Sequence, residues 1–159
     1  MLRVLLLAVA AIGIGPGNPL RPPRLHLAAR ADQARDTALA VLRSAPGLRC
    51  VFDSGTSTVF DRRGRRVLSD RLPAPLILDQ IDHTARHARV VDSEGGSDVS
   101  LLDRRDGITF VEARPLGVSI YTVFAVYTRR GEFRALMSSH MSAPQPVSQT
   151  LFGSCRVAS

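Results

Sequence analysis

The spacing of hydrophobic and polar residues changes near residue 47, and this change divides the chain into two parts. Between residues 25 and 46, apolar side chains recur every three or four positions, with arginine and aspartate between them. This spacing places the apolar residues on one face of a helix, so we expect an amphipathic helix over 25–46. The apolar stripe is rich in alanine, which suits close packing on a sheet; its members are Leu27, Ala31, Ala34, Ala38, Val41 and Leu42.

Residues 47–159 alternate apolar and polar side chains, and glycine-containing turn signals interrupt them at short intervals. Asp53-Ser54-Gly55 is the first of these signals. The pattern predicts a mainly β domain: an antiparallel meander of about 8–9 strands forming a small barrel or sandwich, with one N-terminal amphipathic helix. The run 118–127 is apolar on both faces, so one face would join the core and the other would receive the helix.

The first 24 residues carry the signals of export. A positive start, Met1-Leu2-Arg3, precedes an apolar run over 4–14, which is typical of a signal peptide over 1–15. Residues 16–24 contain four prolines and are expected to form a linker. The apolar run is too short to cross a hydrocarbon core of about 30 Å, so no transmembrane span is expected in the mature chain. We expect a periplasmic or secreted protein; an uncleaved anchor and a misassigned start codon are the alternatives.

Two cysteines lie at opposite ends of the β region, Cys50 in the first expected strand and Cys155 in the last segment. An exported chain folds in an oxidising compartment, where these thiols would pair. First and last strands are neighbours in a closed up-and-down barrel, so a Cys50–Cys155 disulfide would close the β-domain over 47–159. A catalytic thiol is the alternative, but neither cysteine has a CxxC partner.

The composition is that of a globular protein, with 45% hydrophobic residues and a net charge of +7. All 21 basic residues are arginine, and a GC-rich coding bias accounts for the absence of lysine better than an anion site does. The sequence has neither a concentrated basic face nor stacking aromatics, so nucleic acid is not an expected partner. Gly95-Gly96 lacks the context of a nucleotide-binding loop, and no cofactor is expected.

A series of different short motifs follows in order between residues 76 and 155: Ile81-Asp82, Gly95-Gly96, Thr109-Phe110-Val111-Glu112, Gly117, Thr122-Val123-Phe124, Ser138-Ser139-His140, Ser148-Gln149 and Gly153-Ser154-Cys155. In this order they resemble a group of small secreted bacterial β-rich proteins of unknown function. The chain departs from that pattern at Ser139, where arginine is usual, and at Thr150-Leu151. The resemblance implies export, a β fold and a disulfide, and it brings no activity with it.

The most basic segment is a hairpin loop in which four of five residues are arginine: Arg62, Arg63, Arg65 and Arg66. Clustered guanidinium groups bind phosphate and carboxylate groups, so an anionic envelope component is the candidate partner of this loop. A solvated loop without a partner is the interpretation that the composition favours, because arginine is the basic residue throughout the chain. Ser148 and Gln149 are further candidate binding residues, because they return the chain toward Cys155.

A catalytic alternative rests on His140, with Ser139 as nucleophile and Asp82 or Glu112 as acid. No G-x-S-x-G turn supports it. We expect His140 instead to hold the following proline-rich loop by hydrogen bonds. His83 and His87 would lie in a strand–turn–strand segment, where their spacing does not indicate a metal site, and none is expected.

Together these features favour an exported β-domain with a non-enzymatic binding or structural role in the bacterial envelope. A small periplasmic hydrolase using His140 is the alternative. A hollow barrel that carries an apolar ligand is less favoured, because bulky residues would fill the interior: Phe52, Phe110, Phe124 and Phe133.

Overall fold

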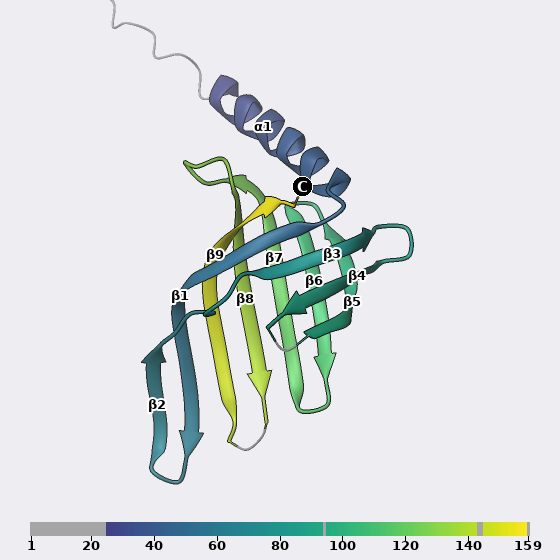
Figure 1. Ribbon diagram of the computed structural model, residues 1–159. Helices are drawn as coiled ribbons and strands as arrows, with labels where there is room; N and C mark the ends of the chain where they lie inside the picture. The colour runs from purple at the N-terminus through teal and green to yellow at the C-terminus, as the bar shows by residue number, and fades with distance from the viewer. Residues whose placement is uncertain (1–24, 94, 143–144, 159) are drawn as a thin grey trace, which may run out of the picture.

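The computed structural model describes residues 25–93, 95–142 and 145–158, with side chains from residue 29 onward. The expected signal peptide and linker lie outside these residues. The described elements are α1 (Leu25–Ser44), β1 (Leu48–Asp61), β2 (Gly64–Ser69), β3 (Leu76–Asp82), β4 (His87–Asp92), β5 (Gly95–Arg104), β6 (Gly107–Arg114), β7 (Gly117–Tyr127), β8 (Phe133–Met141) and β9 (Val147–Val157) (Figure 1).

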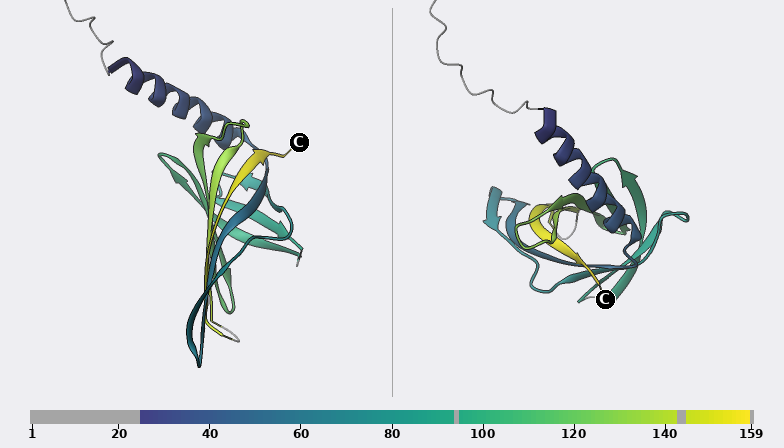
Figure 2. Two further views of the ribbon diagram at one scale, coloured as in Figure 1. Left: turned by 90° about the vertical axis from the view of Figure 1, so that its left-hand side faces the viewer. Right: turned by 90° about the horizontal axis from the view of Figure 1, so that it is seen from above.

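Eight of the nine strands close into an antiparallel barrel. Strands β3 to β9 are neighbours in chain order, and β1 pairs with both β3 and β9, which closes the ring. Strand β2 pairs only with β1 and lies outside the ring as the second arm of a hairpin (Figures 1 and 2). The predicted mainly β meander is therefore confirmed, and its architecture is a barrel. Closure satisfies the edges that an open sheet would expose.

Strand β1 is longer than the sequence predicts, because the expected turn at Asp53-Ser54-Gly55 is a bulge within the strand. The register with β9 shifts between Phe52 and Ser54, and pairing continues on both sides of the shift. Gly55 fits this irregularity because a Cβ there would lie 2.2 Å from the carbonyl oxygen of Thr150. The turn prediction is wrong since turn-forming residues are equally suited to a bulge.

The first residues of β1 pair with β3, whereas Thr56–Asp61 pair with β2 on the same edge. The hairpin of β1 and β2 thereby leaves the barrel and projects beyond its end (Figure 1). The linking segment before β3 is held against β1 by two backbone hydrogen bonds, from Asp70 to Gly55 and from Leu72 to Phe52.

The barrel interior is packed with large side chains. Phe52, Phe110 and Phe133 are buried there, as expected, together with Leu48 and Leu101. The expected inward position of Phe124 is wrong. Its neighbours in the strand, Val123 and Ala125, are buried, so Phe124 lies on the outer face and is only half-buried.

The C-terminal part of α1 packs on one end of the barrel and the rest of the helix extends away from it, so the helix does not lie on the outer face of β7 (Figure 2). Ala38 and Leu42 are buried in the same core cluster as the inward side chains of the strands. Arg43 fixes this end of the helix, because its guanidinium donates to the carbonyl of Arg104 and pairs with Asp103 at 3.4 Å. The expected placement is wrong because the inward face of β7 carries Tyr121 and its outer face stays half-exposed.

The expected apolar stripe of α1 is buried only near the C-terminal end of the helix. Ala31, Ala34 and Val41 are exposed, whereas Ala38 and Leu42 are buried in the core and Leu39 packs against it. Leu42 is the largest of these buried side chains, and the small alanine side chains bury less area.

The predicted disulfide is confirmed. Cys50 and Cys155 are directly opposite each other on β1 and β9, with 4.0 Å between their Cα atoms. Both are fully buried, and the bond joins the first and last strands over a separation of 105 residues.

Candidate functional site

The barrel is hollow at the end opposite the helix. A cavity of about 210 Å³ opens there between the interior of the barrel and the segment that precedes β3. Its walls combine an apolar rim with inward polar side chains from β4, β6, β7, β8 and β9. The lining residues are Leu72, Pro73, Ala74, Pro75, Leu76, Asp92, Ser93, Arg114, Ser119, Tyr121, Met137, Ser139, Met141 and Gln149.

A fully buried carboxylate lies behind this cavity. Glu112 is inaccessible to solvent and follows Ile108 and Phe110 on the inward face of β6. The hydroxyl of Tyr121 donates to its Oε2 atom at 2.7 Å, and the hydroxyl of Ser97 donates to Oε1. A buried charge is costly unless it is paired and hydrogen-bonded, and Glu112 meets both conditions.

Arg114 connects Glu112 to the mouth of the cavity. Its Nε atom lies 2.9 Å from Glu112 Oε1, and its Nη2 atom lies 3.0 Å from Asp92 Oδ2. The hydrogen bond to Glu112, opposed by burial and aided by Asp92, raises the pKa of Arg114 above its usual range. Burial and the bond to Glu112 likewise raise the pKa of the Tyr121 hydroxyl. Arg114 is therefore a cation and Tyr121 a neutral hydroxyl at physiological pH.

Two serines from neighbouring strands form a second polar group in the cavity wall. Ser119 on β7 donates to Ser139 on β8 at 3.1 Å, and both side chains are buried. Gln149 on β9 lies next to Ser139 in the register, and its amide donates to Asp70 at 2.7 Å. Tyr121 gives its single hydroxyl proton to Glu112, whereas Gln149 gives one of its two amide N–H groups to Asp70. The oxygen atoms of both side chains have acceptor capacity.

The structure does not bring together the residues of the catalytic alternative. Ser139 and His140 are consecutive on β8, so Ser139 faces the interior and His140 is exposed on the outer face. Asp82 lies at the turn between β3 and β4, where it accepts the backbone N–H groups of Thr84 and Ala85. Strands β1 and β9 separate β3 from β8 in the sheet. No Ser-His-acid arrangement is assembled from these three residues.

The expected role of His140 in holding the following loop involves residues 143–144, which lie outside the described residues. The ring of His140 makes no hydrogen bond to another described residue, and its neighbours in the sheet are Val118 and Ser148. The start of the loop after β8 is held by Ser142, whose backbone and hydroxyl both donate to the carbonyl of Leu116.

The two histidines near the β3–β4 turn pair with different carboxylates. His83 Nδ1 lies 3.0 Å from Asp103, and His87 Nε2 lies 3.2 Å from Asp98. No cluster of three metal-ligating side chains occurs among the residues with described positions.

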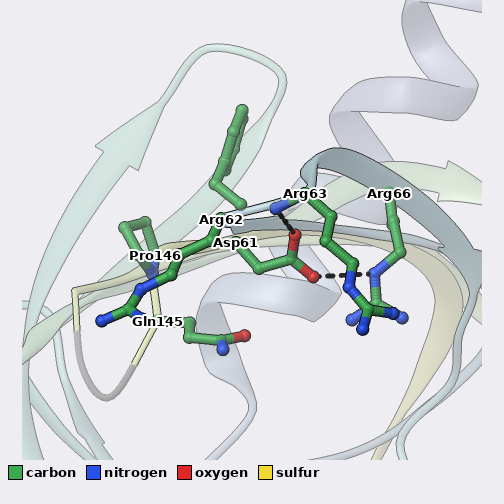
Figure 3. Close-up of a pocket in the computed structure, with 7 residues that line it drawn as sticks. Asp61, Arg62, Arg63, Arg66, Gln145 and Pro146 are labelled. Atoms are coloured by element: carbon green, nitrogen blue, oxygen red, sulfur yellow. Dashed lines mark hydrogen bonds and ion pairs between the residues drawn. The ribbon is translucent and has the colours of Figure 1, made fainter.

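The expected basic hairpin loop is present at the tip of β1 and β2. Asp61 accepts the backbone N–H of Arg63 at 2.7 Å and pairs with Arg66 at 3.1 Å (Figure 3). Gln145 and Pro146, which precede β9, lie beside this tip, and the carbonyl of Pro146 accepts the N–H of Phe60. Ser148 is placed between β1 and β8, away from the loop. Of the candidate binding residues, only Gln149 lines the cavity.

Several residues of this site resemble ordinary turn or core residues in the sequence. Glu112 carries a usable signal: it is a charge at the inward position of a strand that otherwise buries Ile108 and Phe110. The sequence around Arg114 predicts a turn, and the apolar run around Tyr121 predicts a core position. Their meeting depends on the register of β6 and β7, in which Glu112 pairs with Ser119.

Comparison with known protein families, curated proteins and solved structures finds no match to this chain. The fold and site define it as an eight-stranded antiparallel barrel with a helix across one end and a polar cavity at the other. Within the described residues, no helix is both long and apolar enough to cross a membrane.

Proposed function

We propose that this protein is an exported binding protein that holds a small ligand in the open end of its barrel without converting it chemically. The observation that carries this proposal is the buried Glu112–Arg114–Tyr121 network behind the cavity. A barrel that needs only stability gains nothing from such a network, since well-packed apolar residues serve as well or better. At the wall of a cavity, the same groups orient a ligand.

The size of the cavity favours a ligand smaller than a typical drug molecule. Its volume of about 210 Å³ lies below the ~300 Å³ at which drug-sized pockets begin. The rim provides apolar contacts from Leu72, Pro75 and Met141, and the polar groups lie deeper. A compact apolar body with one polar group fits this arrangement.

The charges and acceptors of the site indicate which polar group the ligand carries. Asp92 and Arg114 line the cavity and Glu112 lies behind it, so the network as a whole holds two carboxylates and one guanidinium. Tyr121 donates to Glu112 and Gln149 donates to Asp70, and each of the two side chains keeps an oxygen atom with acceptor capacity. A ligand that donates, as a primary amine or an alcohol, therefore binds in preference to a carboxylate.

Three probes of one shape test this proposal: cyclohexylmethylamine, cyclohexylmethanol and cyclohexanecarboxylate. Isothermal titration at pH 7 should rank the amine first, the alcohol second and the carboxylate last. The variant Ser139→Phe fills the cavity and should abolish binding. Its matched control is Ser138→Phe, which places the same bulk on the half-exposed outer face of β8.

Preferred binding of the carboxylate would contradict the assigned ligand class. Equal binding by both phenylalanine variants would show that the cavity is not the binding site. Failure of all three probes to bind the parent protein would contradict the proposal as well.

The proposal of export is supported by the buried disulfide, which forms in an oxidising compartment. Protein isolated from the native envelope should lack the first 10 to 25 residues and begin between residues 11 and 26. N-terminal sequencing that returns Met1 from soluble cytoplasmic protein would contradict export.

A further inference from the structure

Strand β2 leaves one edge of the sheet open outside the closed barrel. It pairs with β1 through residues 64–69, and no described strand pairs with its other side. All six residues of β2 are exposed. An exposed strand edge presents N–H and C=O groups that pair with another extended chain.

The side chains of β2 repeat one pattern on both faces. Arg65 and Val67 lie on one face of the hairpin, and Arg66 and Leu68 lie on the other, because successive strand residues alternate. Val67 is 53% exposed and Leu68 is 48% exposed, so each face offers one arginine followed by one apolar side chain. Phe60, directly opposite Arg65 on β1, is also exposed and widens the first face.

The hairpin is strongly cationic, with Asp61 as the acidic residue among four arginines between positions 61 and 66. Asp61 pairs with Arg66, whereas Arg62, Arg63 and Arg65 make no ion pair with any described residue. Figure 3 shows Arg62 and Arg63 directed away from each other around the loop. Two copies of this hairpin would repel each other, because they would bring like charges together.

We propose that β2 binds an extended acidic polypeptide by strand addition. In an antiparallel pairing, the partner presents two apolar residues opposite Val67 and Leu68, followed by two acidic residues opposite Arg66 and Arg65. Opposite charges and apolar pairs placed directly across two strands stabilise such a pairing. Arg62 and Arg63 at the loop attract the acidic end of the partner. This site is separate from the barrel cavity and does not depend on a ligand there.

A fluorescein-labelled decapeptide with the central sequence Val-Ile-Glu-Glu tests the proposal by fluorescence anisotropy. The peptide should bind the parent protein, and the same peptide with lysine in place of both glutamates should not. A third peptide carries N-methyl groups on alternate backbone nitrogens, which keeps the charge and removes the edge hydrogen bonds. Its affinity should fall by about tenfold or more, because strand addition depends on the main chain.

Two charge reversals provide the matched variants. Arg65→Glu should weaken the acidic peptide by about fivefold to tenfold, since it turns one attractive cross-strand pair into a repulsive one. Arg134→Glu is the control, because Arg134 is exposed on β8, whose two edges are already paired. It should leave the affinity close to that of the parent.

Other results would overturn the proposal. Equal binding of the N-methylated peptide would mean that charge alone acts, and so would an equal effect of Arg65→Glu and Arg134→Glu. Stronger binding to phosphatidylglycerol vesicles than to the acidic peptide would assign the hairpin to a membrane surface. Dimer formation in sedimentation velocity that Arg65→Glu alters would make a second copy the occupant.

Discussion

Removing the carboxylate of Glu112 should destabilise the barrel strongly. The substitution Glu112→Leu fits the buried position but leaves Arg114 without its closest anion, and the hydroxyls of Ser97 and Tyr121 without their acceptor. Breaking a buried pair from one side costs about 3–5 kcal/mol. The side chain of Arg114 is 29% exposed and retains Asp92, so we expect the lower end, about 3 kcal/mol.

Removing both charges should cost less than removing one. The double variant Glu112→Leu with Arg114→Met leaves no fully buried charge, and Asp92, which loses Arg114, is 25% exposed. It should therefore recover about 1 kcal/mol or more of the loss. Urea unfolding followed by circular dichroism, with the disulfide intact, gives these free energies. Glu132→Leu is the control, because Glu132 is half-buried and accepts a single side-chain bond from Ser154 among the described residues. A Glu112→Leu variant within ~0.5 kcal/mol of the parent would refute this account of the network.

Two further predictions concern the disulfide and the acid limb of stability. Replacing Cys50 and Cys155 by serine should lower the free energy of unfolding by about 4–5 kcal/mol, the value expected for a loop of this length; equal urea midpoints for the oxidised parent and the variant would contradict it. Burial raises the pKa of Asp70, but hydrogen bonds from Ser57, Gln149 and the backbone of Arg71 outweigh it and hold that pKa below 3.8. The stabilisation from Asp70 is therefore complete above pH 3.8 and is lost as the pH falls through the lower folded value. In the variant Asp70→Asn, the free energy of unfolding should fall less steeply below about pH 4 than in the parent. The same pH dependence in both proteins, measured by urea unfolding, would argue against this role.

Features that depend on local pattern were accessible from the sequence. The period of two predicts the strands, and the positions of Cys50 and Cys155 at the ends of the β region predict their bond. The bulge at residues 53–55 could not be predicted from the sequence, because turn-forming residues suit a turn and a bulge alike. The place of α1 also depends on the depth of one leucine, Leu42, in the barrel end.

The candidate cavity is harder to predict from the sequence than the fold is. The sequence indicates Ser139 as a nucleophile, Gln149 as a binding residue and Glu112 as an acid, but it does not indicate that they lie around one cavity. Which inward side chains fill a barrel, and where they leave a space, depends on the radius and stagger of the closed ring. Arg114 reaches Glu112 because both lie on the inward face of β6, and this face is fixed by closure rather than by local pattern.

The binding of a small amine inside the barrel is the central claim, and a ¹H–¹⁵N NMR titration with cyclohexylmethylamine tests it most directly. Saturable shifts should concentrate on the backbone amides around the cavity, at Ser119, Tyr121, Ser139 and Gln149. Amides at the helix-covered end, such as those of Leu48 and Phe133, should stay unchanged. Shifts that do not saturate, or that map to the exposed surface of the barrel, would contradict the claim.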